Sequence, residues 1–258
     1  MRCYIGFFGL TRSLRYTAES IKLGFYEPLR NCGFTTLRAG HFNLPDAITN
    51  SRSGEFSLVP DRSECTLLDL DLCWIEPQQT SAIAGEFAIA RSLPDAFGDE
   101  YRSLRNLCHQ LHSLRRLWSL LQLLDVKESD VVLLLRPDLL YLDVLDPPLN
   151  LAPLLDGHAD VIVPGWQSWG GLNDRFAFCN GRAARAYATR MDLFSDACVS
   201  LGCMHAEQFL SFVARRHNLR IGLTDLRAVR LRANRQIAAN DSGMIHLARS
   251  AGGQRLPR

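Results

Sequence analysis

The stretch DVVLLLRPDLLYLD, at residues 130–143, constrains the fold of this chain more than any other segment. Its five consecutive apolar residues, 131–135, do not alternate with polar ones, which is typical of a strand buried on both faces of a parallel sheet. In open α/β sheets, ligands bind just beyond the carboxyl ends of the strands. The segment therefore predicts a buried strand that brings Asp138 to the ligand-binding rim of an α/β protein.

The start of the chain shows the alternation of strand and helix that such a sheet requires. CYIGFFGL, at residues 3–10, is short, apolar and aromatic, as a buried strand is. Residues 14–29 place Ala18, Ile21, Phe25 and Leu29 at helical spacing, and FTTLRAG at 34–40 indicates a second strand. A strand, a helix and a strand in this order are the usual opening of a doubly wound sheet.

The rest of the chain continues this alternation around two irregular segments. Residues 41–66 are rich in Asn, Pro, Ser and Gly and predict a long loop, and a second irregular segment runs to about residue 101. The remaining predicted elements are strands at 68–77, 159–166 and 175–180, helices at 104–121, 181–195 and 205–217, and a last strand or strand pair at 220–231. We expect one α/β domain over 1–258, with a mixed, mostly parallel sheet flanked by helices and a loose tail at 246–258.

The charge of the chain argues against one class of protein. Lys and Arg number 29 against 27 Asp and Glu, a net charge of +2, whereas a dedicated nucleic-acid binder usually has a larger basic surplus. Lysine occurs only at Lys22 and Lys127, so nearly all basic residues are Arg. A guanidinium group grips phosphate or carboxylate through two parallel hydrogen bonds. Codon preference in a GC-rich coding sequence explains the same enrichment equally well.

The cysteines and the apolar runs indicate the compartment. None of the eight cysteines forms a C-x-x-C pair, and several lie in apolar runs, which favours free buried thiols in a reducing cytoplasm. The apolar run at the N-terminus is short, and no small-residue cleavage site follows it. No stretch approaches the roughly 18 apolar residues that cross a bilayer. We expect a soluble cytoplasmic protein, with peripheral attachment to the inner face of a membrane left open.

The triplet Arg136, Pro137 and Asp138 is the first candidate for chemistry. A carboxylate at a strand end can hold a divalent cation, which can neutralise a departing diphosphate. Alternatively, Asp138 caps a turn and Arg136 is its ion-pair partner. Asp143 is an odd number of residues away, so in a continuous strand it would face the opposite side of the sheet.

Two further segments carry candidate acids and bases. In GWQSWGGLNDRFAF, two tryptophans and paired glycines form a possible platform for a sugar ring or a base, and Asp174 could act as general base toward an acceptor hydroxyl. An ordinary Gly-Gly turn with buried tryptophans is the alternative. In MHAEQFLSFV, Glu207 could contribute to catalysis or to acceptor binding, although favourable placement in a first helical turn also explains it.

The loop after the first strand and one helix face are weaker candidates. In FFGLTRSLRYT, Gly9 permits close approach of backbone to a ligand, and Arg12 lies at the head of a helix, where anions are favoured. The motifs GxxxxGK[ST] and GxGxxG are both absent. The predicted helix at 104–121 presents a polar face, for which a solvated surface is the default interpretation; its histidines could bind metal only with help from elsewhere. This face comprises Arg105, His109, His112 and Arg116, with Asn106 and Gln110 alongside.

Taken together, these segments resemble a known family of bacterial and viral glycosyltransferases that act in surface-polysaccharide synthesis. The resemblance covers most of the chain in the same order, except for 41–66, 80–100 and the tail. The RPD triplet and GLNDRFA are its distinctive motifs. The segments that carry it are FFGLTRSLRYTAESI, NLCHQLHSLRRLW, VVLLLRPDLLYLD, PGWQSWGGLNDRFAF, RAARAYATR and HAEQFL.

The resemblance implies a GT-A-like fold, with a nucleotide-sugar-binding half at 1–143 and an acceptor-binding half at 144–245. It implies transfer of a hexosyl or deoxyhexosyl group to a hydroxyl of a polysaccharide or lipid-linked glycan. It also implies an acidic motif that holds Mn²⁺ or Mg²⁺ at the donor diphosphate. Here Arg136 stands where the usual D-x-D motif has its first aspartate, which puts metal dependence in doubt. Arg136 could itself offset the diphosphate charge, and the single carboxylate of Asp138 would then bind a metal or contact ribose.

By the same resemblance, the remaining site residues take provisional roles. Gly9, Leu10 and Arg12 would lie near the nucleotide, and Asn106 and Gln110 would face the donor sugar. Asp174 and Glu207 become the two candidates for the base, which an inverting enzyme requires and a retaining enzyme need not use. A non-catalytic nucleotide- or glycan-binding protein on the same scaffold is the alternative. The missing glycine motifs count against a dinucleotide oxidoreductase, and the missing P-loop counts against a phosphate-group transferase.

Overall fold

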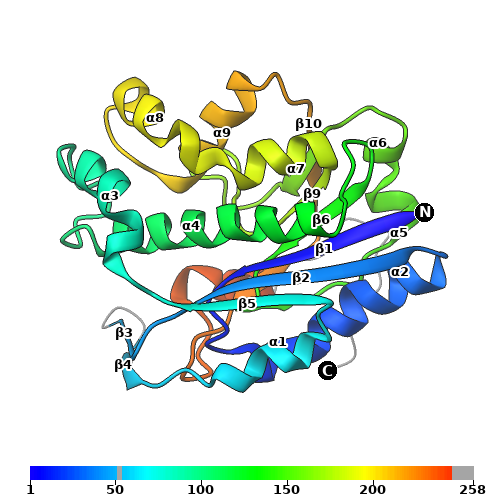
Figure 1. The fold of residues 1–258 in the computed structure, drawn as a ribbon, viewed down its shortest axis with the longest axis horizontal. Coiled ribbons are helices and arrows are strands. Elements are labelled where there is room, and N and C mark those ends of the chain that lie inside the picture. Colours follow the sequence, from blue (N-terminus) through cyan, green and yellow to red (C-terminus); the bar gives the residue numbers. More distant parts are fainter. Residues whose placement is uncertain (51–53, 246–258) are drawn as a thin grey trace.

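The computed structural model of the chain describes residues 1–50 and 54–245. Its centre is a seven-stranded sheet in which every strand runs parallel to the others except β9, which is antiparallel to both of its neighbours (Figure 1). The predicted class, an α/β fold with a mixed and mostly parallel sheet, is confirmed. Across the sheet the strands are β5 (Leu72–Pro77), β2 (Thr35–Leu44), β1 (Arg2–Gly9), β6 (Val131–Leu135), β9 (Ala177–Asn180), β8 (Val161–Pro164) and β10 (Ile221–Thr224).

Strand β1 is central because its side chains are apolar on both faces. Phe7 packs on one side with Leu14 and Phe25, and Phe8 packs on the other side with Leu114 and Leu117. A side chain at Gly6 would put its Cβ 2.8 Å from Leu117 Cδ2, so the neighbouring helix lies close against the strand there. Burial of large apolar side chains on both faces explains the unbroken hydrophobicity of β1 and β6.

Helices cover the two faces of the sheet. The long helix α4 (Arg102–Leu123) crosses β1 and β2 on one face (Figure 1), next to α7 (Gly181–Ala188). The other face carries α1 (Leu14–Ile21), the π-helical turn η1 (Lys22–Tyr26) and α2 (Glu27–Asn31). These three form one continuous helical segment, which confirms the predicted helix at 14–29. It is followed by Gly33, whose φ of 76° favours glycine.

The prediction that residues 130–143 form one strand is wrong in its second half. Strand β6 ends at Leu135, and the chain turns at 136–138 into β7 (Leu139–Tyr141), which pairs antiparallel with β11 (Ala228–Arg230) in a separate two-stranded sheet. Proline lacks the N–H group that would continue the ladder. Instead, the Thr17 hydroxyl donates a hydrogen bond to the Pro137 carbonyl, and the Leu231 N–H donates one to the Asp138 carbonyl.

Both segments that were expected to be irregular contain regular structure. Strand β2 continues to Leu44 because the end of the strand is buried, and a small sheet of β3 (Ile48–Asn50) and β4 (Glu55–Leu58) follows it. The 3₁₀ helix η3 (Arg62–Leu68) comes next. The segment before residue 101 holds η4 (Thr80–Ile83) and α3 (Ala84–Arg91). Short, weakly periodic elements of this kind leave little trace in sequence patterns.

The C-terminal half places further helices beside the sheet. The short helices α5 (Pro147–Asn150) and α6 (Ala152–Leu155) precede β8. The helix predicted at 181–195 is instead α7, η5 (Arg190–Leu193) and the start of α8 (Phe194–Leu201), and α9 (Ala206–Arg216) confirms the helix predicted at 205–217. The predicted strand pair at 220–231 forms, but β10 and β11 belong to different sheets.

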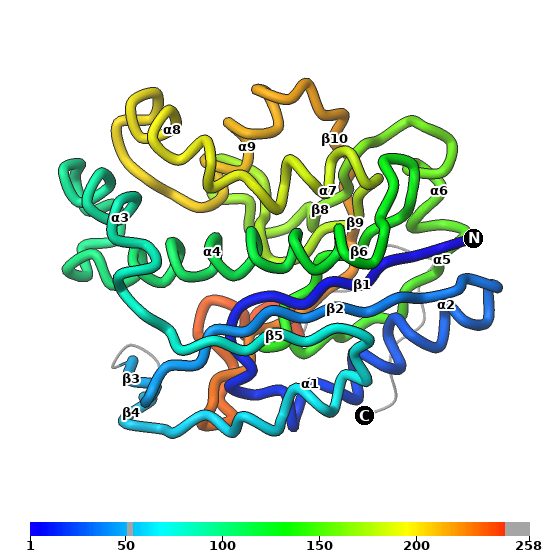
Figure 2. Tube along the Cα trace, in the orientation of Figure 1, coloured from blue at the N-terminus to red at the C-terminus, as the bar shows by residue number. Residues whose placement is uncertain are grey.

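The last described segment returns to the start of the chain. After β11, the chain runs to η6 (Ala239–Ile245) and passes beside the β3–β4 hairpin and the beginning of α1, as the orange and red trace in Figure 2 shows. The Ala233 N–H donates a hydrogen bond of 2.8 Å to Glu55 Oε1, which joins the two segments. The loose tail predicted at 246–258 lies outside the described residues.

A membrane span requires a length and a hydropathy that the described helices do not reach individually. No single one of them is long and apolar enough to cross a bilayer. The segments 190–201 and 206–216 meet the criterion only when they are taken together, and they are bent by 104°.

Candidate active site

The candidate site is centred on the turn that follows β6. There Asp138 accepts hydrogen bonds from the Nε and Nη2 atoms of Arg136, both at 2.9 Å, and from Nη2 of Arg12 at 2.7 Å. Arg12 comes from the loop after β1, so the carboxyl ends of two neighbouring parallel strands supply the three side chains. Asp138 lies at the sheet rim with Arg136 as its ion-pair partner, as the second alternative for the triplet predicts.

The electrostatics of this group are those of a strongly held carboxylate. Asp138 is 3% exposed. Burial alone would raise its pKa, but the charges of Arg136 and Arg12 and their hydrogen bonds outweigh burial and hold the pKa of Asp138 well below its usual range. The carboxylate thus stays ionised and holds both guanidinium groups in place.

A third arginine reaches the same place from the C-terminal segment. Arg232 follows β11, directly after the residue whose N–H is bonded to the Asp138 carbonyl. Burial and the nearby charges of Arg12 and Arg230 lower the pKa of Arg232 to about 10. Its Nε atom is buried and has no hydrogen-bond partner. Glu55 lies 3.8 Å from Arg12, so four segments of the chain converge here.

Gln110 links this group to the candidate base. Its Oε1 accepts a hydrogen bond of 2.8 Å from Nη1 of Arg136, and its Nε2 donates one of 3.0 Å to Oδ2 of Asp174. Asp174 is buried, lies 3.7 Å from Arg190 Nη2, and accepts a hydrogen bond at its carbonyl from the Tyr187 hydroxyl. The structure therefore brings the predicted residues Arg12, Gln110, Arg136, Asp138 and Asp174 into one connected network.

The other residues predicted for the nucleotide and the sugar lie around this network without joining it. Gly9 ends β1 with φ 105°, and its N–H donates a hydrogen bond of 2.8 Å to Ser113 Oγ; nothing lies within 4 Å of the position of an added Cβ. Leu10 follows it, half-buried, and Asn106 is exposed one turn before Gln110 on α4. Their predicted roles remain predictions.

Glu207 lies apart from the arginine network. Its carboxylate is 2.9 Å from Nδ1 of His205, and this interaction raises the pKa of His205. Its backbone carbonyl accepts a hydrogen bond of 3.0 Å from Leu172 N–H, which ties the loop before Asp174 to the start of α9. In that loop Trp166 is half-buried and donates a hydrogen bond to the Leu226 carbonyl, whereas Trp169 is 54% exposed. Only Trp169 is therefore free to offer an aromatic face.

The interpretation of the polar face of α4 as solvated is wrong for its histidines. His109 and His112 are both buried, and only Arg105 and Arg116 are exposed. The Nε2 atom of His112 is 2.5 Å from Glu76 Oε1. Part of the face lies against the buried carboxyl end of β2 and beside Glu76 of β5 rather than against water, which helical spacing alone does not reveal.

Burial of His109 predicts acid sensitivity of the fold. Burial, with the charges of Arg105 and His112, lowers the pKa of His109 to about 4, below the ordinary value of 6.5. Between these two values the unfolded chain binds the extra proton, so stability falls as pH falls. When the pH falls from 7 to 5, the unfolding free energy of His109→Gln should fall by about 2 kcal/mol less than that of the wild type. Urea unfolding at the two pH values measures this, and equal losses would contradict it.

The surroundings of Asp138 do not fit a divalent cation. Each of its carboxylate oxygens already accepts a hydrogen bond from a guanidinium group, and cations are repelled there. Across residues 1–50 and 54–245, no group of three or more His, Cys, Asp and Glu side chains could hold a metal ion. The predicted role of Asp138 as a metal ligand therefore finds no supporting donor set among these residues.

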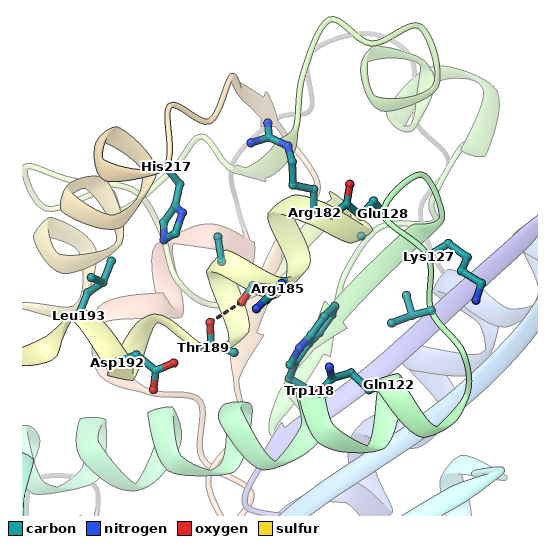
Figure 3. Close-up of a pocket in the computed structure, with 13 residues that line it drawn as sticks. Trp118, Gln122, Lys127, Glu128, Arg182, Arg185, Thr189, Asp192, Leu193 and His217 are labelled. Atoms are coloured by element: carbon teal, nitrogen blue, oxygen red, sulfur yellow. Dashed lines mark hydrogen bonds between the residues drawn. The ribbon is translucent and has the colours of Figure 1, made fainter.

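A separate pocket lies near the amino ends of the parallel strands, away from the network around Asp138. It has a volume of about 500 Å³ and is lined by Trp118, Arg182, Arg185, His217 and neighbouring side chains from α4, α7 and the end of α9 (Figure 3). Lys127 and Glu128, which precede β6, also line it. The amino ends of parallel strands are not where ligands of open α/β sheets usually bind. The pocket thus stands apart from the network around Asp138.

Sequence patterns do not identify Arg232, Glu55 or Arg190 as parts of the site. Arg232 lies near Asp138 only because β11 pairs with β7, nearly 90 residues away in sequence. Glu55 lies in a segment expected to be a loop, and Arg190 is almost fully buried after α7. The enrichment of arginine over lysine is the single sequence signal that pointed toward the two arginines, and none pointed toward Glu55.

No protein-family model matches the sequence, and no curated protein sequence matches it significantly. Several solved structures match this chain, and three of them match over 87% of it. Mouse xyloside xylosyltransferase 1, in its apo form, is 12% identical to this chain; the match covers 85% of that protein and has a TM-score of 0.39. A glycosyltransferase involved in the glycosylation of the major capsid of PBCV-1 is 14% identical; the match covers 82% of that protein and has a TM-score of 0.41. The galactosyltransferase LgtC, in complex with donor and acceptor sugar analogs, is 12% identical; the match covers 73% of that protein and has a TM-score of 0.39. Similarity this distant does not assign the chain to a family.

Proposed function

We propose that this protein is a glycosyltransferase that binds a nucleotide-sugar donor at the carboxyl ends of β1 and β6. The observation that carries the proposal is the network in which half-buried arginines at the sheet rim are joined through Gln110 to the carboxylate of Asp174. Such a site offers positive charge for a diphosphate leaving group and a carboxylate at a fixed distance from it. The resemblance of the sequence motifs to polysaccharide glycosyltransferases supports the same reaction class.

The residues of the network divide the work of sugar transfer. In the reaction, the bond between the anomeric carbon and the diphosphate breaks, and a bond to the acceptor oxygen forms. Arg12 and Arg136 offset the charge that develops on the departing diphosphate. Asp174 accepts the proton of the acceptor hydroxyl in an inverting reaction. Its Oδ2 accepts a hydrogen bond from Gln110, which orients the carboxylate for this role.

The finer assignments of the donor and acceptor follow the sequence resemblance. We propose transfer of a hexosyl or deoxyhexosyl group to a hydroxyl of a polysaccharide or lipid-linked glycan. The first half of the chain would bind the nucleotide and the second half the acceptor. The reaction would then take place in the cytoplasm, with a lipid-linked acceptor at the inner face of the membrane.

Turnover of nucleotide sugars tests the proposal. UDP-, GDP- and dTDP-sugars are each incubated with the protein and with glycan or lipid extracts, and release of nucleoside diphosphate is measured. We expect release from at least one donor, stimulated by acceptor. No turnover with any donor would contradict the proposal and would favour a non-catalytic nucleotide- or glycan-binding protein.

The two candidates for the base are separated by substitution. Asp174→Asn should lower kcat by about a hundredfold or more, because a general base contributes roughly 10²- to 10⁴-fold. Glu207→Gln should lower kcat by less than tenfold, because the Glu207 carboxylate interacts with His205 rather than with the network. Full activity of Asp174→Asn would remove Asp174 from the mechanism, and full activity of both variants would remove both.

A further inference from the structure

The arginines near Asp138 carry more charge than the carboxylates beside them neutralise. Arg12, Arg136 and Arg232 share two carboxylates, those of Asp138 and Glu55. Close by, Arg175 and Arg230 both bind the single carboxylate of Asp241, at 2.7 to 3.0 Å. The described residues of this region therefore hold five guanidinium groups against three carboxylates.

These two groups are near enough to act on one another. The charge of Arg230 acts on Arg232, and the charge of Arg136 acts on Arg175. The pair of Arg190 and Asp174 adjoins them and is balanced in charge. A surplus of buried positive charge is costly unless an anion compensates it. The surplus of two matches the charge of a dianionic diphosphate.

Arg232 is the member with the least compensation. Its Nε–H is buried without an acceptor, although the charges of Asp138 and Glu55 act on it. Its neighbours Arg12 and Arg136 each have a carboxylate oxygen within hydrogen-bond distance. A planar guanidinium group with an unpartnered Nε–H next to two other cations is suited to bind phosphate oxygens.

We propose that the donor diphosphate binds without a metal ion, held by Arg12, Arg136 and Arg232 at the carboxyl ends of β1 and β6. This inference rests on the proposed function and specifies how the donor is recognised. Asp138 acts as a positioning residue that holds two guanidinium groups, and the arginines supply the charge that a cation supplies in other sites. Arg230 and Arg175 add positive charge to the same region.

Calorimetry with inorganic pyrophosphate tests the inference on the full-length protein. Pyrophosphate is titrated first in EDTA and then with saturating Mn²⁺. We expect binding in EDTA, with a Kd that Mn²⁺ does not improve, because a cation would neutralise the charge that the arginines recognise. If pyrophosphate binds only when Mn²⁺ is present, this inference is overturned and the proposed reaction is left intact.

Substitution of Arg232 links the binding to this residue. Arg232→Gln should weaken pyrophosphate binding in EDTA by about tenfold or more, whereas Arg232→Lys should lose less. Arg235→Gln is the matched control, since it removes the same charge from the same hairpin, where Arg235 is exposed and lies 4.6 Å above the ring of Tyr16. It should change the Kd by less than twofold, and an equal loss in Arg235→Gln and Arg232→Gln would contradict a specific role.

Two further measurements separate anion binding by Arg232 from a structural role and from the proposed reaction. Arg232→Gln should not lower the Tm of the free protein, because the Arg232 Nε–H has no partner to lose; a lower Tm together with unchanged pyrophosphate binding would show a structural role instead. A protein that binds pyrophosphate in EDTA but turns over no donor would contradict the proposed reaction and leave this inference standing. A protein that turns over a donor but binds no pyrophosphate in EDTA would overturn the inference alone.

Discussion

Asp138→Asn is expected to lower donor turnover by about a hundredfold without weakening pyrophosphate binding. The buried carboxylate holds Arg12 and Arg136 by three hydrogen bonds, so its loss leaves both guanidinium groups free to move. Their positive charge remains and can still bind an anion, but it no longer lies where the leaving group departs. A ligand of a metal ion would behave in the opposite way, because its loss would abolish metal-dependent binding.

Asp143→Asn is the matched control for this change. Asp143 is buried like Asp138 and accepts hydrogen bonds of 2.8 to 3.0 Å from Arg227, but it lies away from the network. Both variants should lose about 3 kcal/mol or more of unfolding free energy, since each leaves a buried guanidinium group without its carboxylate. Turnover per folded molecule should fall in Asp138→Asn alone. Equal turnover in the two variants would reduce Asp138 to a structural residue.

Gly171→Ala is expected to lower both the stability of the fold and the turnover. An added Cβ would lie 2.1 Å from the carbonyl oxygen of Glu207 and 2.5 Å from the backbone nitrogen of Gln208, and backbone atoms cannot rotate away as a side chain can. The loop before Asp174 would have to leave the start of α9. We expect a loss of about 1–3 kcal/mol of unfolding free energy and a fall in kcat of more than tenfold, because Asp174 would be displaced.

Gly181→Ala controls for the steric clash. Its added Cβ would lie 1.9 Å from the carbonyl oxygen of Lys127, which precedes β6 and lies at the end of the sheet away from the site. This variant should be destabilised at least as much but should keep its turnover per folded molecule. Urea unfolding and initial rates on the same preparations measure both effects. A similar fall in kcat for the two variants would show that the position of the loop at 165–174 does not govern the reaction.

Sequence patterns predict the sheet well where burial is uniform. The unbroken apolar runs of β1 and β6 and the helical spacing of α1 to α2 reflect packing against both layers, so the α/β class and these elements follow from the sequence. The pattern does not show where β6 ends. Residues 139–141 are as apolar as a continued strand, yet they form β7, because Pro137 breaks the ladder and β11 supplies another partner.

The site is predictable only in part for a similar reason. Arg12, Arg136 and Asp138 follow parallel strands, so their place at the rim follows from the topology of parallel sheets. Asp174 instead precedes the antiparallel strand β9, whose start lies at the same rim. Arg232 reaches the site through a pairing of distant strands, and the burial of His109 depends on how α4 lies against β2 and β5. Both depend on tertiary contacts that residue spacing within one segment does not encode.

A crystal structure with a bound nucleoside diphosphate, in EDTA and with UDP, GDP or dTDP according to which one binds, tests the account most directly. We predict that the diphosphate oxygens lie within hydrogen-bond distance of Arg12, Arg136 and Arg232, at the carboxyl ends of β1 and β6. A diphosphate bound elsewhere, for example in the pocket beside Trp118 and Arg185, would contradict it.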